Sequence, residues 1–568
     1  IFCTLQSEEE SIMISSWPVY QDDWSFAKEE QDIETIKDAV RGVRNIRTEM
    51  NVAPSRKAMI YVVSEKEEVR RAFTEGKLFF TSLAGASEVV IQEDKNGIAE
   101  DAVSVVIHGA TLYIPFAELV DIAQEIERLK KEEKRLTGEL ATIEDLSQLK
   151  ELGIDLKLDF ILNHASAQSP QFKDLVEKGD ESEYRDFFID WNKFWEGHGV
   201  MTDEGYIQPD ESCLKQMFFR KPGLPILMVE FPDGRRVPYW NTFYQEVHGR
   251  TYLGQMDLNI KSEKVWDFYR ETLKKIASYG AAIVRLDAFA YAPKAPGKKN
   301  FLNDPETWEF LQQIHGLAAP LGLTLLPEIH AAYEEKIYKT LADKGYATYD
   351  FFLPGLVIDA IENRRADYLA KWAREVVDDK ISTVNMLGCH DGIPLLDLKG
   401  LLPEDDIRSL IDLIVSRGGM VKNLHGQKNI YYQVNATYYS ALGESDSKML
   451  LARAIQMFMP GKPQVWYLDL FAGKNDHEAV RRAGESGHKE INRTNLSASD
   501  IEEALKKDVV AKQLELLRMR NTHKAFEKGA VITVSEEGPK LSIRYDNGEA
   551  YALLTVDFEA GAYEIELS

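Results

Sequence analysis

The sequence predicts an α/β protein whose main part is built on parallel strands of the barrel type, preceded by a smaller α+β module. Three observations indicate this class. Beyond residue 145, apolar strands alternate with amphipathic helices, which is typical of repeated βα units. Several of these strands end in acidic groups and histidines, as barrel strands do at an active site. At 568 residues the chain is also too long for a single hydrophobic core.

Composition narrows the class of protein. The chain has 44% hydrophobic and 28% charged residues, which is typical of ordinary globular domains. No apolar run approaches the ~20 residues that cross a bilayer, so we expect no membrane partner. The net charge of −25 argues against a general nucleic-acid surface but leaves room for a local basic face. Cys3, Cys213 and Cys389 are far apart and there is no secretion signal, which favours the reducing cytoplasm.

Residues 1–140 predict a small α+β module followed by a coiled-coil helix. Apolar residues recur at helical spacing from about 28 to 50, and Pro54 stops that helix. Short β-branched runs follow near 60–63, 89–91 and 103–107. A Lys/Glu-rich helix from about 117 to 140 then carries a heptad-like apolar stripe, of Ile122, Ile126, Leu129, Leu136 and Leu140. A coiled-coil hairpin needs a second helix, and none follows.

Residues 141–527 predict the parallel α/β domain, with an aromatic-rich insertion at about 167–255. Six strands are expected, at Leu156–Leu162, Ala282–Leu286, Leu323–Pro327, Ala347–Phe352, Ser382–Leu387 and Pro463–Leu468. Within the insertion, an aromatic group at helical spacing favours a local core over a sugar-stacking surface; it comprises Tyr184, Phe187, Phe188, Trp191, Phe194 and Trp195. Residues 528–568 alternate with period two around an Asp-Asn-Gly turn and predict a C-terminal antiparallel β domain.

Candidate catalytic residues follow four of the strands. An isolated Asp at a strand end is usually a helix cap, but here acidic groups and histidines recur at one end of several strands. Because the carboxyl ends of parallel barrel strands meet at one mouth, we expect these residues to converge. They are Asp159, Asn163, His164, Arg285, Asp287, Glu328, His330, His390 and Asp391.

Such a set suits glycosyl transfer with retention. One carboxylate attacks the anomeric carbon, a second carries the leaving-group proton, and a third stays ionised beside the cationic transition state. An Arg beside the nucleophile would lower its pKa, and the imidazoles would hold sugar hydroxyls. Metal binding is the rival use of the cluster, and we favour it less because the Arg would repel the ion. We therefore expect no metal and no cofactor.

The four stretches that carry these residues resemble the signature regions of the α-amylase superfamily of retaining enzymes (glycoside hydrolase family 13). They read "DFILNHAS", "GAAIVRLDAFAY", "TLLPEIH" and "MLGCHDGIP". The resemblance covers about 141–568. It implies that Asp287 is the nucleophile, Glu328 the acid/base and Asp391 the transition-state stabiliser, with Arg285, His164 and His390 supporting the glucose.

Further motifs are similar to the sucrose phosphorylase branch of that superfamily, which moves glucose from sucrose or a related glucoside to phosphate. They are "KPGLP", "GQMDLN", "YYQVNATYYSALG", "PGKPQVWYLDLFAGKND" and "EINR". The resemblance implies a glycosyltransferase-type phosphorylase that binds a sugar and inorganic phosphate and forms α-glucose 1-phosphate. By the same likeness Gln255 and Arg493 line the glucose site, while Lys221, His330, Tyr432 and Gln433 line the acceptor site.

Departures from the family pattern bear on the substrate. Ile430 stands where sucrose phosphorylases often carry the Asp that holds fructose, and "HDGIP" and "INRTN" also differ from the usual motifs. His425 and Lys428 are candidates for binding an anion on the fructose, or are solvated loop residues. Sucrose 6F-phosphate is therefore at least as good a candidate donor as sucrose. Hydrolysis of an α-glucoside is the alternative reaction, with water in place of phosphate.

The first 140 residues resemble the C-terminal part of valyl-tRNA synthetase: the end of its anticodon-binding domain, a small α+β module and the start of its coiled-coil arm. The stretches concerned are "SIMISSWPVY" and "VRNIRTEMNVAPSRKAMIYVV". A basic group would then contact tRNA phosphates, or is a solvated helix face; it comprises Arg41, Arg44, Arg47, Arg56 and Lys57. A tRNA-binding fragment is thus an alternative function. The nucleotide-binding motifs of a synthetase are not in this sequence.

The junction near residue 140 predicts an incomplete barrel. By the family resemblance, "TIEDLSQLKELG" and "DLKLDFILNH" are the second helix and third strand, so the first two strands of a (β/α)8 TIM barrel are missing. An open barrel exposes unpaired edges and core, so we expect impaired stability and activity. The abrupt junction, in a chain that starts at Ile1, favours a chimera produced by joining two gene fragments.

Overall fold

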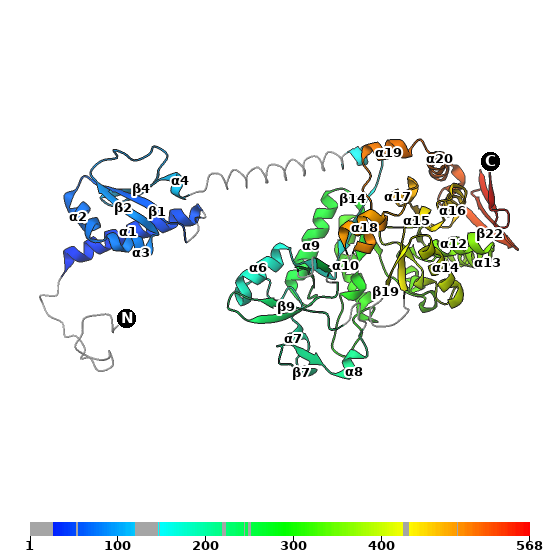
Figure 1. Ribbon diagram of the computed structural model, residues 1–568, viewed down its shortest axis with the longest axis horizontal. Helices are drawn as coiled ribbons and strands as arrows, with labels where there is room; N and C mark the ends of the chain where they lie inside the picture. Colours follow the sequence, from blue (N-terminus) through cyan, green and yellow to red (C-terminus); the bar gives the residue numbers. More distant parts are fainter. Residues whose placement is uncertain are drawn as a thin grey trace. The chain divides into compact units, whose positions relative to one another are not determined.

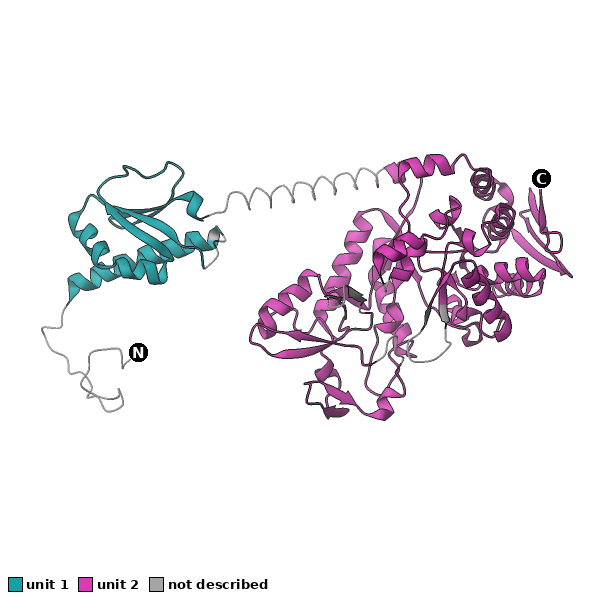
Figure 2. Cartoon of the chain, in the orientation of Figure 1, with its two compact units in different colours: residues 1–145 teal, residues 146–568 magenta. Residues whose placement is uncertain are grey.

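The computed structural model divides the chain into two compact units, residues 1–145 and 146–568 (Figure 2). The structure describes residues 26–50, 52, 55–119, 146, 148–217, 223–243, 245–247, 251–423, 431–484 and 487–568. Beyond residue 119, the predicted coiled-coil helix lies outside this description. In the described ranges, no helix is long and apolar enough to span a bilayer.

The first unit is a four-stranded sheet with helices. Strand order is β2-β1-β4-β3, with β1 and β2 parallel and the other pairs antiparallel. The long helix α1 buries Ile36, Val40 and Val43 in a core shared with the sheet, as its apolar spacing requires. The elements are α1 (Ala27–Glu49), β1 (Ala58–Val63), α2 (Glu67–Glu75), α3 (Lys77–Leu83), β2 (Ala86–Gln92), β3 (Val103–Ile107), β4 (Ala110–Ile114) and α4 (Phe116–Leu119).

The basic group of this unit does not form the continuous outward stripe that the sequence suggested. Arg47 is 9% exposed, and its Nη2 donates to the carbonyl of Arg56 at 2.5 Å. Arg56 in turn donates from Nε to the carbonyl of Glu118 at 2.6 Å. Both guanidinium groups therefore bond the unit's own backbone, whereas Arg41 and Arg44 are exposed on α1. Helical spacing alone did not reveal this difference.

The second unit contains the six parallel strands expected from the sequence, arranged as two sheets. One sheet has the order β15-β14-β5 and the other β16-β17-β21, with every pair parallel. Buried Leu326, Tyr349 and Met386 come from both sheets and form one cluster, so the sheets share an interior. The strands are β5 (Leu156–Ile161), β14 (Ala281–Asp287), β15 (Thr324–Pro327), β16 (Thr348–Asp350), β17 (Thr383–Met386) and β21 (Lys462–Gln464).

The outer edges of β5 and β21, like those of β15 and β16 on the other side of each sheet, have no strand partner in the part of the chain that the structure describes. β5 pairs only with β14, and β21 pairs only with β17. The ammonium of Lys157 on β5 nevertheless reaches the Tyr349 hydroxyl at 3.1 Å and Oε1 of Gln464 on β21 at 2.5 Å. A side-chain bridge thus joins β5 and β21, which are outer strands of the two sheets.

The last parallel strand is shorter than predicted. The expected strand Pro463–Leu468 is replaced after Gln464 by a turn and the short helix α17 (Tyr467–Leu470). The carboxylate of Asp469 accepts the backbone N–H of Tyr438 at 2.8 Å, which holds this helix in the core. A short apolar run does not distinguish a buried strand from a buried helix, which accounts for the wrong boundary.

The insertion after β5 forms its own small sheets and an aromatic core. Trp191, Trp195 and Trp240 are at most 1% exposed and pack together with Phe194, so the predicted local core holds for this half of the aromatic group. Tyr184, Phe187 and Phe188 pack instead in the core that includes β5 and β14. The elements are β6 (His164–Ser166), α6 (Pro170–Lys178), α7 (Trp191–Phe194), β7 (Gly199–Met201), β8 (Ile207–Pro209), α8 (Glu211–Leu214), β9 (Ile226–Glu230), β10 (Arg236–Trp240), β11 (Gln245–Val247), β12 (Thr251–Leu253) and β13 (Gln255–Asp257).

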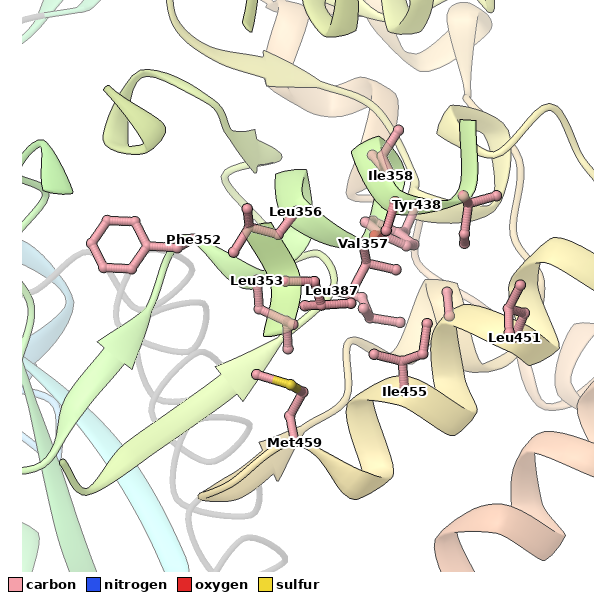
Figure 3. Packing of buried hydrophobic residues seen from close by; sticks show 14 of the residues in the cluster. Phe352, Leu353, Leu356, Val357, Ile358, Leu387, Tyr438, Leu451, Ile455 and Met459 are labelled. Atoms are coloured by element: carbon pink, nitrogen blue, oxygen red, sulfur yellow. The ribbon is translucent and has the colours of Figure 1, made fainter. Parts of the chain in front are cut away.

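Amphipathic helices follow the parallel strands. Leu353, Leu356 and Ile455, from α12 and α16, meet in the core that Figure 3 shows. α16 begins after Ser445, whose hydroxyl accepts the Lys448 N–H as an N-cap. The helices are α9 (Glu263–Ser278), α10 (Glu306–Ala318), α11 (Ile337–Asp343), α12 (Leu353–Asn363), α13 (Asp367–Asp378), α14 (Glu404–Ser416), α15 (Tyr438–Ala441), α16 (Asp446–Phe458), α18 (His477–Ala483), α19 (Ala498–Ala504) and α20 (Asp508–Thr522).

The chain ends in a four-stranded antiparallel sheet in sequential order. Its inward residues Ile543 and Leu554 are fully buried in the core that α12 and α16 share, and Figure 1 shows the sheet beside α13. Its strands are β22 (Val531–Glu537), β23 (Lys540–Asp546), β24 (Tyr551–Asp557) and β25 (Ala562–Leu567). The remaining short sheet, of β18 (Ile393–Pro394), β19 (Met420–Asn423) and β20 (Tyr431–Asn435), lies after β17 in the chain.

Candidate active site

Parallel pairing brings the predicted polar residues to one end of the first sheet. Asp159 of β5 is the register partner of Arg285 on β14, and Asp287 ends β14. The N–H of Glu328, just after β15, donates to the carbonyl of Leu286 at 3.2 Å. These backbone contacts place three side chains from separate strands at one sheet end, as the strand-end pattern predicted.

Arg285 joins three carboxylates. Its Nη1 lies 2.6 Å from Oδ2 of Asp159, and its Nη2 lies 2.6 Å from Oε2 of Glu328 and 3.2 Å from Oδ1 of Asp287. The side chain is 7% exposed. Burial works against its charge, but the carboxylates outweigh burial and hold the pKa of Arg285 above its ordinary value. A permanently charged group thus lies between the carboxyl pair Asp287 and Glu328.

The carboxyl groups of Asp287 and Glu328 titrate in opposite directions. Burial and the charge of Glu328 raise the pKa of Asp287 to about 7, although Arg285 acts the other way. Burial also acts to raise the pKa of Glu328, but hydrogen bonding to His330 and the charge of Arg285 bring it to about 2. The expected lowering of the Asp287 pKa by Arg285 is therefore outweighed. The two groups therefore titrate as one coupled pair, in which the pKa of Asp287 is raised and that of Glu328 is lowered.

His330 lies between two carboxylates. Its Nδ1 is 3.3 Å from Oδ2 of Asp397, its Nε2 is 3.7 Å from Oε1 of Glu328, and its ring stacks on Phe351 at 3.8 Å. Burial lowers the pKa of His330, but Asp397 and Glu328 outweigh it and raise it to about 9. The imidazole is therefore a cation at neutral pH and contacts the candidate acid/base directly.

Asp391 is held as an anion by three basic side chains. Its Oδ1 lies 2.5 Å from Nζ of Lys489 and 3.1 Å from Nη2 of Arg493, and its Oδ2 lies 3.2 Å from Nε2 of His390. Burial would raise the pKa of Asp391, but His390 and Lys489 keep it well below its ordinary range. A third carboxylate was predicted to stay ionised beside the transition state. The contacts with these basic side chains favour the ionised form of Asp391.

Backbone contacts fix the loop that carries Asp391. The side-chain amides of Gln433 and Asn435 both donate to the backbone carbonyl of Asp391 at 2.7 Å. Arg493 donates from Nε to the His390 carbonyl at 2.9 Å. Gln433, expected to line the acceptor site, is 7% exposed and contributes to this loop support, and Arg493 contacts the loop as well as the Asp391 carboxylate.

His164 and Gln255 lie on the two paired strands β6 and β13, at opposite ends of the pairing. His164 pairs with Asp257 in register, and Gln255 pairs with Ser166. The His164 ring lies 5.0 Å from that of Phe243. Lys221, His425 and Lys428, named as acceptor-site residues, lie outside the described part of the chain, and of Tyr432 only the backbone is described.

A buried ion pair under His164 was not found from the sequence. The Lys294 ammonium, 2% exposed, lies 2.9 Å from Oδ2 of Asp257 and 2.8 Å from Oδ1 of Asn163. The Nδ2 of Asn163 lies 3.4 Å from Nδ1 of His164. Lys294 and Asp257 lie 37 residues apart in sequence, in segments that read as loop and strand, so no local pattern indicated their contact.

Lys489 and Asp397 were also missed. Lys489 directly precedes the "EINR" motif, so its neighbourhood was the available signal. Asp397 follows the "HDGIP" stretch and is 3% exposed against His330. Among the described residues, no group of three or more His, Cys, Asp or Glu side chains is arranged to hold a metal ion.

Comparison with known proteins gives one consistent group of relatives. The sequence model of the α-amylase catalytic domain matches residues 136–385. A sucrose 6(F)-phosphate phosphorylase of Ilumatobacter coccineus is 55% identical over 443 residues, which is 76% of this chain and 84% of that protein. A sucrose phosphorylase of Streptococcus mutans is 36% identical, covering 67% of this chain and 75% of that protein.

The fold is similar to that of a solved relative. The crystal structure of sucrose 6F-phosphate phosphorylase from Thermoanaerobacter thermosaccharolyticum superposes with a TM-score of 0.67 at 35% identity, covering 74% of this chain and 82% of that one. The match of the α-amylase model begins at residue 136, so most of the first unit lies outside it.

Proposed function

Because the chain belongs to the sucrose phosphorylase family of the α-amylase superfamily, we propose that it is a retaining phosphorylase that moves a glucosyl group from a sucrose-type donor to phosphate. The product is α-glucose 1-phosphate. One observation carries the proposal at the level of the site: Arg285 joins the carboxyl pair Asp287 and Glu328, while Asp391 is held separately as an anion. Retaining transfer needs these three carboxyl states.

In the first step the Asp287 carboxylate forms a bond to the anomeric carbon while the glycosidic C–O bond breaks. Glu328 gives its proton to the leaving oxygen, and the fructose part departs. The coupled pair has to place its proton on Glu328 for this step, because Asp287 attacks as a carboxylate. Asp391 stays ionised and stabilises the positive charge that develops on the sugar ring.

In the second step an oxygen of inorganic phosphate attacks the same carbon and the Asp287 carboxylate leaves. A proton carried by the phosphate returns to Glu328, so the site is restored to its starting protonation. Two inversions at one carbon give net retention. No cofactor takes part in this scheme.

The reaction is tested by incubating the full chain with inorganic phosphate and either sucrose or sucrose 6F-phosphate, then quantifying α-glucose 1-phosphate and free glucose. We expect glucose 1-phosphate to exceed free glucose. Free glucose alone would identify the alternative, an α-glucoside hydrolase. Neither product, with a folded chain, would contradict the proposal.

We further propose sucrose 6F-phosphate as a donor at least as good as sucrose. The relative at 55% identity acts, by its name, on the phosphorylated sugar. Ile430 also stands where the family often carries a fructose-binding Asp. The ratio of kcat/KM for the two sugars decides this, and a strong preference for plain sucrose would refute it.

For the barrel itself we infer an incomplete (β/α)8 arrangement with its gap between β5 and β21. Six parallel strands in two sheets support this, since the outer strands β5 and β21 have no further strand partner in the described ranges and Lys157 of β5 bonds Gln464 of β21. An open edge weakens a fold that depends on closure, so we expect turnover well below the ~10 s⁻¹ typical of enzymes. A turnover number at or above that value would refute the inference.

For residues 1–140 the resemblance to a synthetase tail stays a prediction. Arg41 and Arg44 on α1 are exposed, whereas Arg47 and Arg56 bond the unit's backbone, which leaves fewer groups for a tRNA contact. A titration of the chain with tRNA at low salt tests the contact. Binding that is absent there would contradict it.

A further inference from the structure

Resting on the proposed function, we infer that Lys489 is a phosphoryl-binding residue of this site, which takes either the attacking phosphate or the phosphate of the donor. The observation that carries this is an imbalance of charge at Asp391. Nζ of Lys489 and Nη2 of Arg493 both contact the same carboxylate oxygen of Asp391, Oδ1. By contrast, Arg285 alone is shared by the three carboxyl groups of Asp159, Asp287 and Glu328.

The need for such a cation follows from the site's own charge. A phosphate dianion must approach a centre that holds the carboxyl groups of Asp159, Asp287, Glu328 and Asp391. Like charges a few ångströms apart repel, and the repulsion is stronger in a partly buried site than in bulk water. A cation that is not fully neutralised is therefore required where the phosphate enters.

The other cations of the described site are already engaged. Arg285 is 7% exposed and contacts three carboxylates. Lys157 bonds Tyr349 and Gln464, and burial lowers its pKa. Lys294 is 2% exposed against Asp257. Each would have to give up a buried partner to meet an anion.

Lys489 differs from these groups in exposure and in number of contacts. Its side chain is 36% exposed, and its one hydrogen bond in the described structure goes to Oδ1 of Asp391, an oxygen that Arg493 also contacts. Arg493 is further tied to the His390 carbonyl through Nε, so it is the fixed partner of the two. A lysine ammonium is a point charge on a flexible stem, and it can turn from Asp391 to an incoming phosphoryl group while Arg493 and His390 stay in contact with the Asp391 carboxylate.

The test uses the full chain and the variants Lys489→Met and Lys489→Arg. Lys448→Met is the matched control, because Lys448 is 34% exposed and also contacts one carboxylate, that of Glu362, outside the site. Calorimetric titration with inorganic phosphate, sucrose 6F-phosphate and sucrose measures binding without requiring turnover. We expect Lys489→Met to weaken binding of a phosphate-bearing ligand at least tenfold, Lys489→Arg less than threefold, and Lys448→Met not at all.

The source of the phosphoryl group is separated by which ligand is affected. If Lys489→Met binds inorganic phosphate more weakly but sucrose 6F-phosphate as before, Lys489 binds the attacking phosphate. If it binds sucrose 6F-phosphate more weakly but inorganic phosphate as before, Lys489 binds the phosphate of the donor. If Lys489→Met binds both phosphate ligands like the parent chain, or if the parent chain binds neither, the inference is wrong. Equal loss for plain sucrose would also overturn it, since Lys489 would then act only through Asp391. A parent chain that binds phosphate but forms no glucose 1-phosphate refutes the proposed reaction and not this inference.

Discussion

Nη2 of Arg285 lies 2.6 Å from Oε2 of Glu328, a closer contact than the 3.2 Å between the same nitrogen and Asp287. The candidate acid/base therefore takes the closer contact with the cation, and its pKa is lowered while that of the candidate nucleophile is raised. The two carboxyl groups act as one titrating pair whose working state carries a single proton.

The pair predicts a fall in activity on the alkaline side. One proton is needed for the leaving group, and the pair loses it as the pH rises through about 7, the pKa of Asp287. We expect kcat/KM for a sucrose-type donor to be highest below that pH and to fall tenfold per unit well above it. Initial rates from pH 5 to 9 measure this. A profile that stays flat to pH 9 would contradict the assignment of the shared proton.

Removing the acid/base carboxyl group separates proton transfer from folding. Glu328→Gln keeps the side-chain size and an oxygen for Arg285 but has no proton to give, so kcat for the donor should fall by about 10²–10⁴-fold. It also removes the negative charge that helps to raise the pKa of Asp287, so Asp287 should ionise at lower pH. The pH dependence of the kinetics with sucrose 6F-phosphate measures both effects. Near-ultraviolet circular dichroism checks that the fold is unchanged. Activity within threefold of the parent chain, with the fold unchanged, would exclude Glu328 from this role.

Asp397 controls the charge of His330 across a 3.3 Å contact. Burial alone would lower the pKa of His330, and Asp397 is the main group that raises it to about 9. In Asp397→Asn we therefore expect the His330 pKa to fall by more than one unit. Proton NMR of the imidazole, assigned with a His330→Gln variant, measures the titration. An unchanged titration near pH 9 would show that Glu328 suffices to hold the charge.

Strand-end residues could be predicted from the sequence because one-dimensional patterns encode them. Asp287 ends an apolar strand and Glu328 directly follows one, and parallel pairing then brings such ends together. Contacts between distant loops leave no such pattern. Lys294 and Lys489 read as ordinary surface lysines, yet one is 2% exposed and the other contacts Asp391. Arg47 showed the converse, since its helical spacing suggested an outward face while its guanidinium bonds the backbone.

The buried pair Lys294 and Asp257 predicts a stability change that a second substitution should reverse in part. Asp257 is fully buried, and Thr242 also donates to it from its N–H at 2.9 Å and its hydroxyl at 2.7 Å. Lys294→Met leaves that carboxylate without its cation, and the free energy of unfolding should fall by about 3–5 kcal/mol. The double variant Lys294→Met, Asp257→Asn removes the unpaired charge and should recover part of the loss, since the amide still accepts from Thr242.

Urea unfolding followed by tryptophan fluorescence measures this effect, because Trp240 donates to Thr242 at 3.0 Å and reports on the same region. Lys448→Met, which breaks a more exposed pair with Glu362, serves as the comparison and should cost less. If Lys294→Met unfolds at the same urea concentration as the parent chain, the buried pair does not stabilise the region under His164. If the double variant is less stable than the single one, the Asp257 carboxylate contributes through Thr242 more than through the lysine.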